Sequence, residues 1–210
     1  MNIDQYLLFV AITSVFLLSP GPSVMFSINN GVRHGIKKSS IAVLGNIFAF
    51  QLFTVLSTLG LGAVLTASNE IFNILKYSGA AYLLYLGLKI WRAPVVLQQQ
   101  AISAKEQNSD ALTLFRRGFL VTSSNPKLLV YISALLPQFI DTQQALIPQM
   151  VLLGITSALV MCTVFMSYAI IGTKSRCWFE SPKKLKLFNR FSSVVFIGFG
   201  AALGFSENKI

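Results

Sequence analysis

The stretch Ser124-Asn125-Pro126-Lys127 places an amide, a helix-starting proline and an amine inside a long apolar run. A lysine near the centre of a bilayer costs at least about 2.5 kcal/mol, so it usually faces a cavity or a partner. The ammonium of Lys127 could bind a carboxylate, or it could hold a structural carbonyl. Catalysis is disfavoured, because it would need a nucleophile with a base, paired carboxylates or metal ligands.

A second interruption, Ser19-Pro20-Gly21-Pro22-Ser23, lies in the first apolar run. Prolines cannot donate backbone hydrogen bonds, so the carbonyls one turn earlier need other partners. Pro22 and Pro126 both suit the first position of a new half-helix, and Asn125 suits the N-cap before it. We expect two half-helix N-termini to face each other, each with about half a positive charge, and to attract an anionic group such as a carboxylate.

The elements that must position these residues are apolar segments. Of the 210 residues, 54% are hydrophobic and 11% are charged, whereas about 25% of the residues in a soluble domain are charged. Apolar runs of roughly 20 residues are long enough to cross a bilayer. The sequence therefore predicts an all-α integral membrane protein, a single transmembrane domain over 1–210, with six helices over about 5–31, 40–66, 70–91, 112–140, 144–172 and 190–206.

The basic residues are distributed unevenly between these segments. All of the 17 lysines and arginines except Lys76, Lys127 and Lys209 lie in the first, third and fifth connections, whereas Glu70 and Asp141 lie in the second and fourth. The positive-inside rule places the odd-numbered connections in the cytoplasm and both termini in the periplasm. The net charge of +10 is thus explained by topology, and no nucleic-acid partner is expected.

A polar linker over 95–111 separates a first three-helix repeat, 1–94, from a second, 112–210. Because three is an odd number, the second repeat enters the membrane from the opposite side. Each interruption lies about 8–12 residues, or roughly 12–18 Å of helix, from the nearest cytoplasmic arginine, so the first and fourth helices should be broken near the midplane. Matched breaks in an inverted repeat predict a transporter's binding site, and kinking for packing is the alternative.

The expected substrate site combines both breaks with two polar residues of the second segment. Asn46 and Gln51 are candidate liners, with interhelical hydrogen bonding as their competing use. No cofactor and no metal site are expected, since Cys162 and Cys177 do not form a ligand motif. The scarcity of acidic residues inside the segments favours a neutral substrate. The full set is Ser19, Pro20, Gly21, Pro22, Ser23, Asn46, Gln51, Ser124, Asn125, Pro126 and Lys127.

Several strings in combination resemble the LysE/RhtB family of amino-acid exporters. They are Ser19-Pro20-Gly21-Pro22, Asn125-Pro126-Lys127, Leu136-Pro137-Gln138-Phe139-Ile140-Asp141 and the segment 79–87. The resemblance implies a bacterial inner-membrane protein that exports an amino acid or a derivative, driven by the proton gradient. The family often carries Gly-Asp midway along the second segment, where this chain has Ala49-Phe50. Proton coupling would then need Lys127, a water chain or the substrate itself.

Other functions remain open at this stage. An exporter of another small solute or of a cation would have a similar architecture, although cation sites usually need acidic ligands. An intramembrane enzyme would lack its catalytic groups, and a scaffold would not need matched breaks. The expected partners are a small-molecule substrate and the lipid bilayer. A homodimer is also open, although the Gly200-Ala201-Ala202-Leu203-Gly204 pattern is expected to pack within the chain.

Overall fold

The computed structural model describes residues 3–19, 21–67, 69–92, 109–140, 144–174 and 182–205, and all the regular secondary structure in these ranges is helical. The expected all-α class is therefore confirmed. The helices run in the order α1 Ile3–Leu18, α2 Pro22–Ala67, α3 Asn69–Arg92, α5 Ala111–Ser123, α6 Pro126–Val130, η1 Tyr131–Leu135, η2 Leu136–Phe139, α7 Leu146–Lys174 and α9 Pro182–Phe205.

α2 consists of two helices joined by a bend at Gly35. Gly35 has φ 72° and ψ 178°, a backbone conformation that glycine adopts at little cost because it lacks a Cβ atom. Among the described helices, Pro22–Ser57, which contains this bend, and Leu146–Lys174 are long and apolar enough to cross a membrane, and Ile3–Leu18 is a shorter apolar helix.

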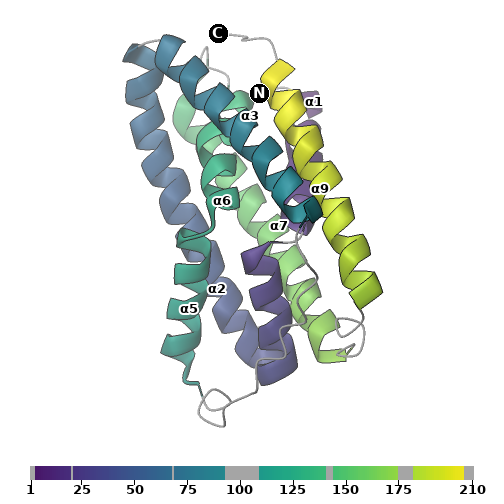
Figure 1. Cartoon of the computed structure of the whole chain (residues 1–210). Coiled ribbons are helices and arrows are strands. Elements are labelled where there is room, and N and C mark those ends of the chain that lie inside the picture. The colour runs from purple at the N-terminus through teal and green to yellow at the C-terminus, as the bar shows by residue number, and fades with distance from the viewer. Residues whose placement is uncertain are drawn as a thin grey trace.

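The helices form an elongated bundle whose two ends differ in charge. The N and C marks lie at one end in Figure 1, whereas the bend in α2, the start of α5 and the end of α7 lie at the other. Arg33, Lys37 and Lys38 flank the bend, and Lys174 lies in the last turn of α7. The described basic residues at the bend of α2 and at the end of α7 therefore lie at the end opposite to the termini.

Two predicted boundaries need correction. The second segment starts directly after Gly35 rather than near residue 40, because Gly35 alone makes the turn. The sixth starts at Pro182 rather than near residue 190, because the proline suits the first helical position and lysines tolerate a helix. Of the fifth connection expected over 174–190, residues 175–181 lie outside the described ranges.

Both predicted helix breaks are confirmed. α1 ends at Leu18 and α2 begins at Pro22, while α5 ends at Ser123 and α6 begins at Pro126. Pro20, which was expected to contribute to the first break, lies outside the described residues.

The chain after the second break is less regular than the half-helix that the sequence predicts. α6 spans only five residues, and a π-helix and a 3₁₀-helix follow. Pro137 has no N–H for the carbonyl four residues earlier, so the regular ladder cannot continue there. Instead, the Leu136 amide donates to the Tyr131 carbonyl, and the Ser57 hydroxyl donates to the Ile132 carbonyl over 3.4 Å.

The carbonyls released by the prolines have partners elsewhere in the chain. The Ser19 hydroxyl donates to the Phe16 carbonyl over 2.7 Å, and the Tyr168 hydroxyl on α7 donates to the Leu18 carbonyl over 2.6 Å. The backbone N–H of Asn125 donates to the Thr122 carbonyl over 3.0 Å. These bonds make the breaks compatible with an apolar environment, where an unpaired carbonyl is costly.

Glycines allow the helices around the breaks to touch through their backbones. A Cβ atom on Gly31 of α2 would overlap the Ala169 carbonyl of α7, and one on Gly118 of α5 would overlap the Ala42 carbonyl of α2. α3 and α9 pair similarly, because a Cβ atom on Gly200 would lie 2.9 Å from the Ala80 carbonyl oxygen. This contact confirms that the Gly200–Gly204 pattern packs within the chain.

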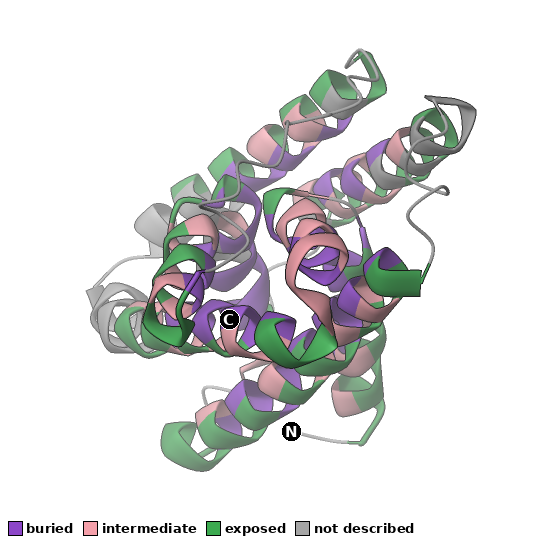
Figure 2. Cartoon of the chain, turned by 90° about the horizontal axis from the view of Figure 1, so that it is seen from below, coloured by how far each residue is buried: buried purple, intermediate pink, exposed green. Residues whose placement is uncertain are grey.

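The interior of the bundle is aromatic and the outside is largely apolar. Figure 2 shows buried residues on the inward faces of the helices and exposed residues on the outward faces. Large buried side chains include Phe9, Phe16, Phe50, Tyr131, Phe165 and Phe196, and large exposed ones include Phe48, Ile147, Leu159, Leu187 and Phe205. Exposed apolar side chains in such number are typical of a surface that contacts lipid.

We expect Gly118→Ala to lower the stability of the purified protein by about 1–3 kcal/mol, because the added methyl group must push α5 away from α2. Thermal unfolding in detergent would measure this loss. Gly198→Ala is the matched control, since a Cβ atom there meets no atom within 4 Å and alanine favours a helix. Equal stability of the two variants would contradict the proposed role of the glycine contact.

Tyr168→Phe should cost about 1 kcal/mol, because it removes the hydrogen-bond donor to the Leu18 carbonyl at the first break. Thermal unfolding measured in the same detergent would detect the change. Tyr85→Phe serves as the control, because Tyr85 is exposed on α3. A Tyr168→Phe protein as stable as the control would show that this bond does not support the break.

Candidate functional site

The two helix breaks meet inside the bundle, and Lys127 joins them. The Lys127 Nζ atom donates to the Ser19 carbonyl oxygen over 2.6 Å and to the Ser19 Oγ atom over 2.8 Å. Lys127 is only 4% exposed and Ser19 is fully buried. A side chain at the start of the second half-helix thus holds the end of α1, 108 residues away in the sequence.

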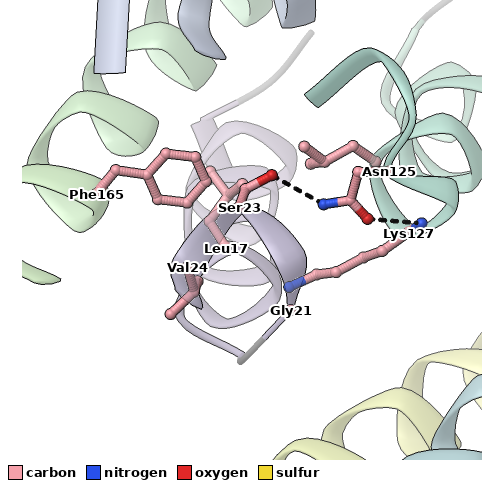
Figure 3. A pocket seen from close by; sticks show the side chains of 8 residues that line it. Leu17, Gly21, Ser23, Val24, Asn125, Lys127 and Phe165 are labelled. Atoms are coloured by element: carbon pink, nitrogen blue, oxygen red, sulfur yellow. Dashed lines mark hydrogen bonds between the residues drawn. The ribbon is translucent and has the colours of Figure 1, made fainter. Parts of the chain in front are cut away.

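Asn125 makes a second bridge between the breaks. Its Oδ1 atom accepts from the Lys127 backbone amide over 3.2 Å, so Asn125 is the N-cap of α6 and Pro126 is the first helical residue, as predicted. Its Nδ2 atom donates to the Ser23 hydroxyl, in the first turn of α2, over 3.0 Å. The side-chain amide of Asn125 therefore caps α6 and also contacts the first turn of α2 (Figure 3).

A small cavity lies at this meeting point. Its volume is about 10 Å³, close to the minimum for one water molecule. The side chains of Asn125 and Lys127 lie on one side of it and Phe165 lies on the other (Figure 3). The structure therefore represents a closed arrangement, in which the lining side chains must move before a larger molecule can enter. The cavity is lined by Leu17, Gly21, Ser23, Val24, Asn125, Lys127, Leu128 and Phe165.

The ammonium group of Lys127 is surrounded by neutral partners. Besides the two Ser19 oxygens, its Nζ atom lies 4.8 Å from the ring centroid of Phe16 and 5.1 Å from that of Phe196. Aromatic faces and the C-terminal end of a helix both attract a cation. Among the buried side chains of the described residues, Lys127 is the single formally charged one, so a formal charge in this region is positive.

The structure places Asn46 and Gln51 away from the lining of this cavity. Asn46 accepts a hydrogen bond from the Thr122 hydroxyl on α5 over 3.1 Å. Gln51 donates to the Gly154 carbonyl on α7 over 2.7 Å. Both residues make interhelical hydrogen bonds, the competing use that the sequence left open.

The other expected site residues divide into two groups. Gly21 and Ser23 line the cavity with Asn125 and Lys127, and Ser19 contacts Lys127 directly. Pro22, Ser124 and Pro126 are exposed and shape the breaks through their backbone.

Sequence reasoning missed the apolar part of the lining. Leu17, Val24 and Leu128 lie within three residues of a break, so proximity could have identified them. Phe165 lies on α7, in an apolar run that carries no local signal. Within the described ranges, no group of three or more His, Cys, Asp or Glu side chains could hold a metal ion.

Comparisons with known proteins identify a family for this chain. The LysE type translocator family model matches residues 14–207. The chain is 30% identical over 203 residues to the homoserine/homoserine lactone efflux protein of Salmonella typhi, covering 97% of each chain. It is 29% identical over 189 residues to the leucine efflux protein of Enterobacter sp. (strain 638), covering 89% of each chain. No solved structure matches it. The chain therefore belongs to the LysE type translocator family.

Proposed function

We propose that this protein exports a neutral amino acid, or a close derivative, from the bacterial cytoplasm, and that the meeting point of the two breaks is its substrate site. The observation that carries the proposal is the buried Lys127 ammonium, held between the breaks by neutral partners. The names of the relatives, which describe efflux of leucine and of homoserine or its lactone, support this substrate class.

A substrate carboxylate would replace the Ser19 oxygens as the acceptor for Lys127. Charge-assisted hydrogen bonds to a carboxylate are stronger than those to a neutral carbonyl or hydroxyl, so the exchange is favourable. The first amides of α2 lack partners within their own helix and add positive potential near Ser23. The substrate amino group would find an acceptor in the Ser19 carbonyl, which Lys127 leaves when it pairs with the carboxylate.

A neutral side chain fits the charges of this region. The buried residues described include no aspartate or glutamate. A buried cationic side chain without a partner is strongly unfavourable, and Lys127 would repel it further. The same argument disfavours metal cations, which prefer carboxylate ligands.

The arrangement in the membrane is part of the proposal. Two three-helix repeats of opposite orientation would cross the inner membrane six times, with the basic connections in the cytoplasm and both termini in the periplasm. Support comes from the bundle, where the bend of α2, the start of α5 and the end of α7 lie opposite to the termini (Figure 1). The two breaks, joined by Lys127 and Asn125, would then lie at the same depth near the midplane.

Transport would proceed by movement of one repeat against the other around the site. The bonds from Lys127 to Ser19 and from Asn125 to Ser23 both join the first repeat to the second. A substrate that takes over these donors would loosen the two repeats from each other. The proton gradient would drive export, with Lys127, a water chain or the substrate carrying the proton in place of an acid at Ala49-Phe50.

Lys127→Gln should weaken substrate binding by roughly 10–150-fold, because a charged hydrogen bond of about 1.5–3 kcal/mol is lost. Counterflow of a labelled amino acid into proteoliposomes gives the substrate KM. Lys89→Gln is the control, since Lys89 is exposed in the last turn of α3 and should leave KM unchanged. A Lys127→Gln protein with the wild-type KM would exclude the ammonium as the carboxylate partner.

The topology can be tested with reporters fused after Ile210 and within the linker at Gln99. Alkaline phosphatase, which is active only in the periplasm, should be active after Ile210 and inactive at Gln99. A fluorescent protein that folds only in the cytoplasm should give the reverse pattern. Cytoplasmic fluorescence from the fusion after Ile210 would overturn the proposed orientation.

A further inference from the structure

The cavity between the breaks has a polar side and an apolar side. Ser23, Asn125 and Lys127 supply the polar groups, whereas Leu17, Val24, Leu128 and Phe165 supply only carbon atoms. Figure 3 shows Asn125 and Lys127 on the opposite side of the first-break residues from Phe165. The lining thus matches a molecule with a charged head and an uncharged tail.

We propose that the apolar side is a subsite for the substrate side chain, that it takes uncharged aliphatic side chains, and that Phe165 sets the size it admits. This inference rests on the proposed function. To that function it adds the class of substrate side chain that is accepted and the residue that selects this side chain by size.

The hydrogen bond of Tyr168 keeps Phe165, which lies on the same face of α7, next to the first break. Tyr168 lies three residues later on the same helix, and residues at this spacing share a face. Because the Tyr168 hydroxyl donates to the Leu18 carbonyl, this face of α7 is held against the end of α1. Phe165 is 1% exposed, so the phenyl ring is fixed beside Leu17 and Val24 in the cavity wall.

The chemistry of this wall decides which side chains it accepts. A leucine or valine side chain would exchange water for contact with Leu17, Val24, Leu128 and Phe165, which is favourable. A lysine or glutamate side chain would bring a charge to a wall without polar partners, which is unfavourable. The head group would remain at Lys127, so discrimination would depend on the tail alone.

The size of the ring decides how large the side chain can be. The cavity holds about 10 Å³ in the closed arrangement, and Phe165 is the largest apolar side chain in its lining. Any aliphatic tail must therefore occupy space that the ring leaves by rotating or by moving with α7. Shortening residue 165 should admit larger tails, while a leucine at this position should have an intermediate effect.

The test uses the full chain in proteoliposomes, with counterflow of labelled leucine and competition by unlabelled amino acids. For the wild type, leucine and valine should compete at least tenfold better than lysine or glutamate. In Phe165→Ala, the ratio of phenylalanine to alanine affinity should rise about tenfold or more, as expected for a change in an apolar pocket. Phe165→Leu should shift the same ratio by a smaller factor.

Leu159→Ala is the matched control, because Leu159 lies on the same helix and is 64% exposed. Its affinity ratios should equal those of the wild type. The inference is overturned if Phe165→Ala and Phe165→Leu transport leucine with unchanged ratios, or if lysine competes with the wild type as well as leucine does. The wild-type competition decides the second point even if a variant fails to insert into the membrane.

The two proposals fail in different ways. If the wild type carries no amino acid under any imposed pH gradient or membrane potential, the proposed function is wrong. If it carries leucine while residue 165 has no influence on selectivity, the proposed function stands and the side-chain subsite is wrong.

Discussion

The need to pair every backbone carbonyl in an apolar environment governs this structure. At the two breaks, three carbonyls lose their usual helical donor to proline, those of Phe16, Leu18 and Thr122. Each finds another donor: a serine hydroxyl in the same turn, a tyrosine on α7 and a backbone amide. A fourth carbonyl, that of Ser19, takes its donor from Lys127 in the other half of the chain. The carbonyls left without a helical donor at the first break therefore determine where Tyr168 and Lys127 make their long-range hydrogen bonds.

This constraint explains why structure and binding depend on the same side chain. Lys127 has two acceptors at Ser19 and two aromatic neighbours, but none of these carries a negative charge. Lys127 stabilises the closed arrangement through these neutral partners. A carboxylate would bind its ammonium group more strongly than they do. In the proposed transport cycle, the substrate competes with the protein's own backbone for one ammonium group. That competition would link occupancy of the site to the contact between the two repeats.

The helices around the site touch through their backbones, whereas the two breaks touch through side chains. Backbone contacts at Gly31 and Gly118 leave no room for a Cβ atom, and interiors packed in this way shift between discrete arrangements rather than deforming continuously. The breaks, in contrast, are joined by a few side-chain hydrogen bonds across a small cavity. Because these glycine contacts also join the two repeats, movement of one repeat against the other is expected to switch α2 between discrete packings against α5 and α7, together with the hydrogen bonds at the breaks.

The sequence by itself determined the local features of this protein. Both breaks, the cap at Asn125 and the approximate ends of most helices followed from rules that act within one turn, such as the missing N–H of proline and the side-chain acceptor of asparagine. These features depend on neighbours in sequence, which are fixed before the chain folds.

Only the tertiary structure decided which side chains share the cavity. Asn46 and Gln51 are polar and lie in an apolar segment, yet their helix is turned so that one meets Thr122 and the other meets Gly154. Phe165 and Tyr168 look like any other residues of an apolar run, yet they reach the first break. The rotation and vertical position of each helix set these contacts, and both arise from packing against helices distant in the sequence, which no single segment encodes.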